Sequence, residues 1–196
     1  MSLEKRRARF LELGGRFECE KPDPLLVVPT IELALFNRLR IAVALYVSKC
    51  IPGNQIFLDE SELMEAFVKN RAAIRNCTPN GMLVPKRHLI LEYNAVIQAF
   101  IAVIDSLNIG DFISSWHIPL NMRFKDGEAV KENLERHHPT EHTHSDSWAG
   151  ESSASVTTII PLFGDTERNR VDYFSPPEDF DESWLVTSTR ESYDPN

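Results

Sequence analysis

The side chains best suited to chemistry lie in one short run of the chain, from His142 to Trp148. His142, His144, Asp146 and Trp148 alternate there with small residues that carry hydroxyl groups. In an extended strand successive side chains point to opposite faces, so these four residues would share one face. An imidazole and a carboxylate two residues apart can bind one divalent metal ion. The run therefore predicts a metal site with His144 and Asp146 as ligands.

Strand geometry limits how many residues of this run can share one ion. A strand rises about 3.3 Å per residue, so His142 and Asp146 would lie roughly 13 Å apart in a straight strand. Metal–ligand bonds are about 2 Å long, so only one adjacent pair can hold the ion. His142 would then either hydrogen-bond a ligand or substrate or remain solvated. The third ligand must come from another part of the chain.

Helices are expected throughout the first part of the chain. Apolar residues at helical spacing predict helices at 30–49, 59–76 and 88–107, after a short one at 2–13 that ends at Gly14 and Gly15. Asp59, followed three residues later by Glu62, is typical of a capped helix start. Residues 1–110 are therefore predicted to form a helical part.

Strands are expected in the second part. From Trp116 to Phe124, apolar residues alternate with a polar face that carries His117, Asn121 and Arg123, which predicts a strand. Further strands are expected at 142–148, 155–163 and 170–174. Residues 111–196 are predicted to form the β part of one integrated domain.

This order of helices, strand and hairpin resembles the Fe(II)/2-oxoglutarate-dependent dioxygenases. The resemblance rests on His144-Ser145-Asp146 and its setting, from Glu141 to Glu151, with the strand at 156–161 and the turn at Gly164-Asp165. It covers residues 110–175 and is closest to the StrG-like branch of streptomycin-biosynthesis and related antibiotic or sugar-pathway proteins.

The resemblance implies a fold class, a cofactor set and a reaction. The fold would be α+β, with helices packed on an antiparallel double-stranded β-helix of jelly-roll, cupin-like type, either complete or incomplete in this chain. His144 and Asp146 would bind Fe(II), 2-oxoglutarate would occupy open iron positions, and Trp148 would wall the pocket. The reaction would be the oxidative hydroxylation of a small-molecule or sugar-like metabolite.

The chain departs from the family pattern in its third ligand. The family has a later histidine followed by an arginine, whereas no histidine follows His144 here. Three alternatives remain open: the chain is part of a longer protein, it is a complete domain that has lost the chemistry, or it borrows a ligand from upstream. His117 is the best upstream candidate, with Arg123 on the same polar face, and either residue is otherwise an ordinary strand residue.

Composition narrows the partners and the rival functions. The net charge of −8 argues against nucleic-acid and anionic-membrane binding, and the longest apolar run is too short for a membrane span. Three widely spaced cysteines and no signal peptide predict a cytoplasmic protein with free thiols. A cupin-type site fits poorly, because Glu151 lies seven positions after His144. The remaining rival is a non-catalytic binding module.

Overall fold

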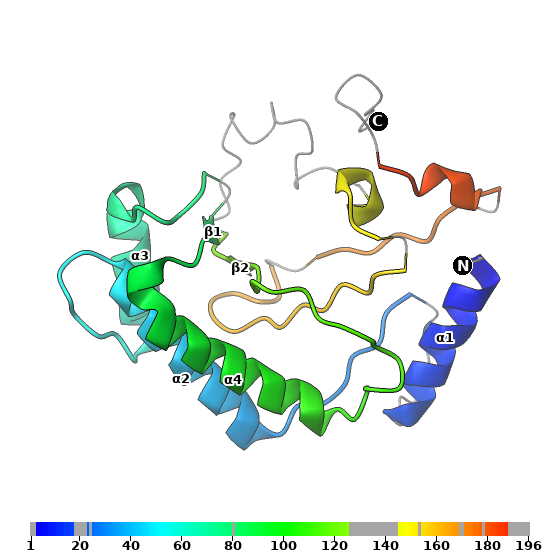
Figure 1. Ribbon diagram of the computed structural model, residues 1–196. Coiled ribbons are helices and arrows are strands. Elements are labelled where there is room, and N and C mark those ends of the chain that lie inside the picture. The colour runs from blue at the N-terminus through cyan, green and yellow to red at the C-terminus, as the bar shows by residue number, and fades with distance from the viewer. Residues whose placement is uncertain are drawn as a thin grey trace. The chain divides into compact units, whose positions relative to one another are not determined.

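The computed structural model describes residues 3–17, 23, 25–79, 81–125, 145–152, 154–168, 171–177 and 179–187. Figure 1 shows the chain as a ribbon. Contacts between its residues divide it into two compact units. The first unit contains Met1–Thr30, Ala129–Ile160 and Val171–Asn196, and the second contains Ile31–Glu128 and Pro161–Arg170.

The first unit contains helix α1 (Leu3–Arg16) and the short 3-10 helices η3 (Asp146–Ala149) and η4 (Glu182–Trp184). Glu4 lies in the first turn of α1 and Arg16 in its last, and both charges complement the helix dipole. The predicted end of this helix at Gly14 was wrong. Gly14 is buried within α1, and a helical glycine costs only about 1 kcal/mol relative to alanine.

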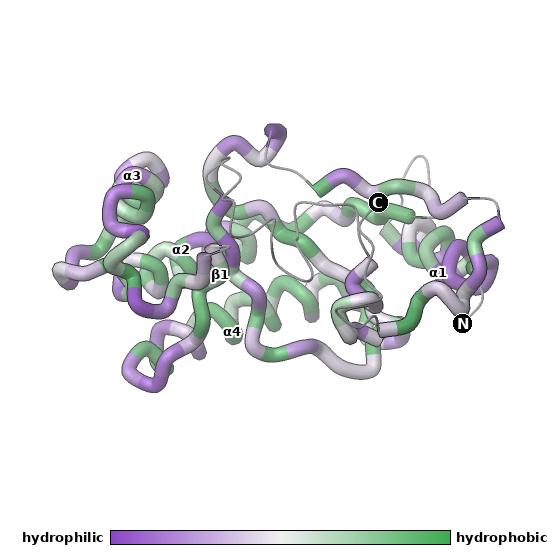
Figure 2. Tube along the Cα trace, turned by 90° about the horizontal axis from the view of Figure 1, so that it is seen from above, coloured by the Kyte–Doolittle hydropathy of each residue, from purple (hydrophilic) through white to green (hydrophobic). Residues whose placement is uncertain are grey.

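The second unit is built on two long helices, α2 (Leu33–Cys50) and α4 (Ile90–Ser106), which pack against each other. Tyr46 of α2 meets Tyr93 of α4 with ring centroids 5.5 Å apart. Hydrophobic residues run along α4 in Figure 2. Both helices were predicted from their apolar spacing, and both predictions are confirmed to within three residues at each end.

Helix α4 and the 3-10 turn before it (η2, Arg87–Leu89) are together long and apolar enough to be a candidate membrane span. By length and composition alone, Arg87–Ser106 could span a membrane, a test that the core helix of a soluble protein also passes. Five residues of α4 are buried in the second unit: Tyr93, Val96, Ala99, Val103 and Ile104.

Helix α3 (Glu60–Asn70) begins where the sequence predicted. The Asp59 carboxylate accepts a hydrogen bond of 3.0 Å from the backbone N–H of Glu62, which satisfies one of the free donors at the helix start. The α-helix ends at Asn70 rather than 76, and a 3-10 turn follows (η1, Arg71–Ala73). Leu63 and Phe67, on the apolar face of α3, are buried.

The described residues form one antiparallel strand pair, β1 (Met82–Leu83) with β2 (Met122–Arg123). At its end, the Gly81 carbonyl accepts a 2.9 Å hydrogen bond from the backbone N–H of Phe124. A Cβ at Gly81 would lie 1.9 Å from the Phe124 carbonyl oxygen, and the φ of Gly81 is +79°. Only glycine fits there. The Phe124 ring stacks on Phe67 with centroids 3.7 Å apart, which ties the strand pair to α3.

A buried polar cluster joins α2 to the loop before β1. The Asn76 side-chain amide donates to the Val84 carbonyl at 3.0 Å and lies 3.5 Å from the Tyr46 hydroxyl and 3.4 Å from the Cys50 sulfur. Burial raises the pKa of the Tyr46 phenol and that of the Cys50 thiol. Both groups are therefore neutral at physiological pH.

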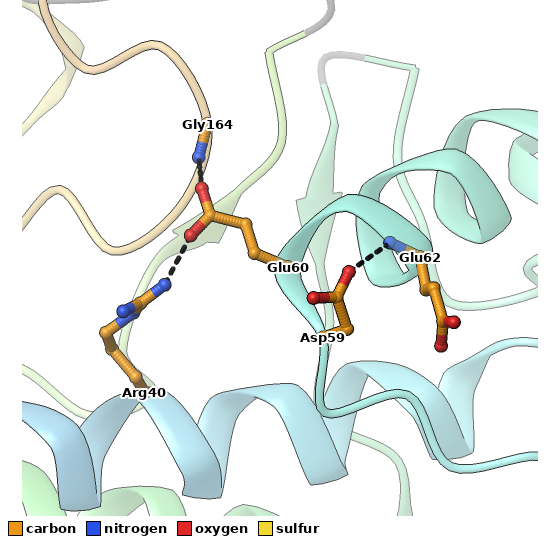
Figure 3. Close-up of polar contacts among 5 residues, drawn as sticks. All are labelled: Arg40, Asp59, Glu60, Glu62 and Gly164. Atoms are coloured by element: carbon orange, nitrogen blue, oxygen red, sulfur yellow. Dashed lines mark hydrogen bonds and ion pairs between the residues drawn. The ribbon is translucent and has the colours of Figure 1, made fainter.

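A second polar connection, the Glu60 clamp, joins α2, α3 and the 161–168 loop (Figure 3). One Glu60 oxygen pairs with the Arg40 guanidinium, and the other accepts a 2.6 Å hydrogen bond from the Gly164 backbone N–H. The Arg40 guanidinium also lies 5.0 Å from the centre of the Phe163 ring, a cation–π contact. The clamp holds the loop on the helices of the second unit.

The predicted jelly-roll is wrong for the part of the chain that the structure describes. Residues 155–163 and 171–174 form no strand among the described residues, and residues 146–149 form η3. Of the strand predicted at 115–124, only Met122–Arg123 pairs. Two side chains on the apolar face of that predicted strand, Trp116 and Ile118, are exposed. The physical reason is that alternating polar and apolar residues favour an extended backbone, whereas a sheet also requires a neighbouring strand to pair with the backbone donors and acceptors.

Candidate functional site

Asp146 begins a tight turn rather than lying within a strand. The turn is closed by backbone hydrogen bonds from Trp148 to Ser145 and from Gly150 to Ser147, at 3.0 and 3.1 Å. Gly150 ends it with a φ of +103°, a conformation that glycine adopts without strain. The turn fixes the backbone from which the Asp146 carboxylate projects.

The Asp146 carboxylate is held by Thr157, eleven residues further along. The Thr157 hydroxyl donates a 2.8 Å hydrogen bond to Oδ2 of Asp146. The pKa of Tyr173 is raised, first by burial of its phenol and second by the negative charge of Asp146. The Tyr173 phenol therefore remains neutral at physiological pH.

Asp146 lines a polar hollow of about 170 Å³, the Asp146 hollow, in the first unit. Its wall consists mostly of hydroxyl-bearing side chains, with one guanidinium and one aliphatic residue: Ser145, Ser147, Ser152, Ser155, Thr157, Arg6 and Leu185. The Ser145 and Ser147 hydroxyls lie 2.8 Å apart, and Ser147 is buried. Such a wall can hydrogen-bond a small polar molecule.

Trp148 does not line the Asp146 hollow. Its indole N–H donates a 2.7 Å hydrogen bond to the backbone carbonyl of Trp184. The Trp184 ring in turn meets Phe180 edge to face, with centroids 5.7 Å apart. Trp148 thus connects η3 to η4, and its predicted role in walling a pocket stays a prediction.

The other predicted site residues fall in three places. His117 and Arg123 are exposed residues of the second unit, Arg123 in β2 opposite Met82. His142 and His144 lie outside the described residues. Asp146 is the one predicted metal ligand whose surroundings the structure describes.

The described residues do not by themselves form a complete metal site. Across the described ranges, no three His, Cys, Asp or Glu side chains come close enough to hold a metal ion together. The carboxylate of Asp146 and the hydroxyls beside it are oxygen donors, which suit hard divalent cations. A facial triad needs two imidazoles as well, and no imidazole is among the residues that line the Asp146 hollow.

Sequence reasoning missed most of the Asp146 hollow. Thr157, Ser155 and Arg6 were not predicted, and neither was Tyr173. One signal was available, because six of the thirteen residues from 145 to 157 are Ser or Thr. That density of hydroxyl groups beside an aspartate could have indicated a polar pocket.

Comparison with protein-family models, curated proteins and solved structures finds no match for this chain. The function is therefore argued from the site.

Proposed function

We propose that this chain binds a divalent metal ion through His144 and Asp146 and acts as a non-heme Fe(II)/2-oxoglutarate-dependent oxygenase on a small-molecule or sugar-like metabolite. The observation that supports the proposal most directly is the Asp146 carboxylate, which lines a hydroxyl-rich hollow. His144, two residues earlier, supplies the imidazole of the His-x-Asp pattern.

Each described residue of the Asp146 hollow has a distinct role in this proposal. Thr157 fixes the rotation of the Asp146 carboxylate, as hydrogen-bond partners of metal ligands commonly do. Ser152 and Ser155 offer donors and acceptors to the hydroxyl groups of a sugar-like molecule. Arg6 contributes a positively charged group suited to a carboxylate. When bound, Fe(II) would activate O₂ for hydroxylation, with 2-oxoglutarate as the co-substrate that is oxidised and decarboxylated.

The test is metal titration of the full chain, with Mn(II) as a paramagnetic stand-in for Fe(II). We expect His144→Ala and Asp146→Asn each to weaken Mn(II) binding at least about tenfold, and Thr157→Val to weaken it by about tenfold. Asp179→Asn is the matched control, since Asp179 is an exposed aspartate of the same unit. Equal affinity in the parent and the three site variants would refute the metal site.

The pH dependence of metal binding follows from the ligands. Imidazole must be deprotonated to bind a metal, so Mn(II) affinity should fall as the pH drops through about 6–7. The Asp146→Asn variant should keep this dependence at a weaker overall affinity, whereas His144→Ala should lose it.

A non-catalytic binding module is the second candidate. It is favoured by the absence of a three-ligand cluster among the described residues. Oxygen consumption coupled to 2-oxoglutarate decarboxylation separates the two candidates. Mn(II) binding without such turnover in the Fe(II)-loaded chain would favour the binding module.

A further inference from the structure

A hollow of about 220 Å³, the α4-end hollow, lies in the second unit where α4 ends. The proposed oxygenase site does not use it. Its wall combines three isoleucines with an indole, a carboxylate, an amide and a glycine: Ile104, Ile109, Ile113, Trp116, Asp105, Asn108 and Gly110. The lining is thus mixed: apolar side chains stand beside one amide and one acidic group.

The electrostatics of the α4-end hollow favour a cation. Asp105 lies in the last turn of α4, where the helix dipole adds partial negative charge. No basic residue lines the hollow, and no side chain in the described part of the chain pairs with the Asp105 carboxylate. A positively charged group is the natural complement of this end of the hollow.

Trp116 provides a second attraction for a cation. Its ring meets Phe100 edge to face, with centroids 5.7 Å apart and an interplanar angle of 87°. The indole remains 37 % exposed, so part of its surface is open to a ligand. Tryptophan is the aromatic residue that attracts ammonium groups most strongly.

The apolar part of the wall indicates the rest of the ligand. Ile104 and Ile109 are each 7 % exposed, so both are packed in place, and their side chains at the wall can contact methylene groups. The volume lies below the roughly 300–1,000 Å³ of pockets that hold drug-sized molecules. The occupant should therefore be a short apolar chain.

We propose that the α4-end hollow binds a primary alkylammonium group, with the ammonium at Asp105 and Trp116 and the alkyl chain on the isoleucines. The same chemistry occurs in a free alkylamine and in a lysine side chain. Neither source requires the Asp146 hollow, so this proposal stands independently of the oxygenase proposal.

The experiment is an NMR titration of the full chain at about pH 7 and about 0.15 M salt, following the indole N–H signal of Trp116. The probe is n-hexylammonium chloride, with 1-hexanol and hexanoate as matched controls for charge. We expect saturable binding of hexylammonium with a Kd on the order of 1 mM, weaker binding of hexanol and none of hexanoate. Hexanol binding as tightly as hexylammonium would overturn the proposal, as would no saturable binding of hexylammonium.

Two variants test the placement of the ligand. Asp105→Asn should weaken hexylammonium binding about three- to fivefold, the range for an exposed ion pair, and leave hexanol binding unchanged. Gly110→Leu should weaken both at least about tenfold, since nothing lies within 4 Å of a Cβ placed there and the added side chain can fill the hollow. Asp111→Asn is the control, because Asp111 does not line the hollow.

Unchanged hexylammonium binding in Asp105→Asn would overturn the proposal, provided that the variant melts like the parent. A blocked lysine, Nα-acetyl-lysine N-methylamide, distinguishes the two sources of the ammonium. Tighter binding of the blocked lysine than of hexylammonium supports a lysine side chain as the ligand, and the reverse order supports a free amine.

Discussion

Replacing Asn76 by alanine should destabilise the second unit by about 2–3 kcal/mol. The variant loses the 3.0 Å hydrogen bond to the Val84 carbonyl, worth about 1 kcal/mol. It also leaves the buried Tyr46 hydroxyl and the carbonyl of half-buried Val84 without the amide, at about 1–2 kcal/mol more. Asn76 is only 7 % exposed, so water cannot readily replace the lost partner.

Asn70→Ala is the matched control for this prediction. The Asn70 amide also donates to a backbone carbonyl, that of Ala66, at 2.8 Å. However, Asn70 is half-buried at the end of α3, where water can reach the carbonyl and alanine is the better helix former. We expect its cost to stay below about 0.5 kcal/mol.

Urea unfolding followed by far-UV circular dichroism measures both variants against the parent. Tyr46→Phe adds a third point: the 3.5 Å contact to Asn76 is long, so its removal should cost less than about 1 kcal/mol. If Asn76→Ala were no less stable than Asn70→Ala, the buried amide would not hold the loop to α2 and the reasoning would fail.

Three further predictions concern the second unit. Because burial raises the pKa of Tyr46 in the folded state, its contribution to stability is complete below about pH 10, where the unfolded tyrosine is still neutral. That contribution is lost as the pH rises further. The urea concentration at the midpoint of unfolding should therefore fall less between pH 7 and pH 11 in Tyr46→Phe than in the parent. Gly81→Ala should lower the free energy of unfolding by more than about 3 kcal/mol, because of the clash with the Phe124 carbonyl and the positive φ. Gly53→Ala has the positive φ but no clash, so it should cost about 1 kcal/mol. Thermal melting compares the two variants, and equal losses of stability would argue against the clash. Glu60→Gln should speed trypsin cleavage at exposed Arg168 several-fold by releasing the 161–168 loop, while Glu62→Gln on the same helix should cleave like the parent.

The helices could be predicted because their determinants are local. The apolar spacing of α2 and α4 and the Asp59 cap lie within a few residues of the elements that they specify. Strand pairing depends on distant partners, and the alternation at 115–124 says nothing of whether one exists. Ile118 shows the result: it alternates correctly yet remains 56 % exposed.

The candidate site divides in the same way. Asp146 was singled out because the His-x-Asp spacing is local. Thr157 and Arg6 reach the same hollow from eleven residues later and from the N-terminal helix. Only the folded chain brings them together, so residue spacing could not reveal them.

The Glu60 clamp also has a consequence for the order in which the chain folds. Glu60 and Gly164 are separated by 104 residues, and the entropy cost of closing a loop grows with its length. On the ribosome, α2, α3 and α4 are all synthesised before Gly164 exists, so the helices can pair while Glu60 has only Arg40 as a partner. Docking of the 161–168 loop is therefore a late step that fastens an already assembled helical scaffold. In nascent chains of increasing length, the backbone amides of α2 and α4 should become protected from hydrogen exchange before the amide of Gly164 does.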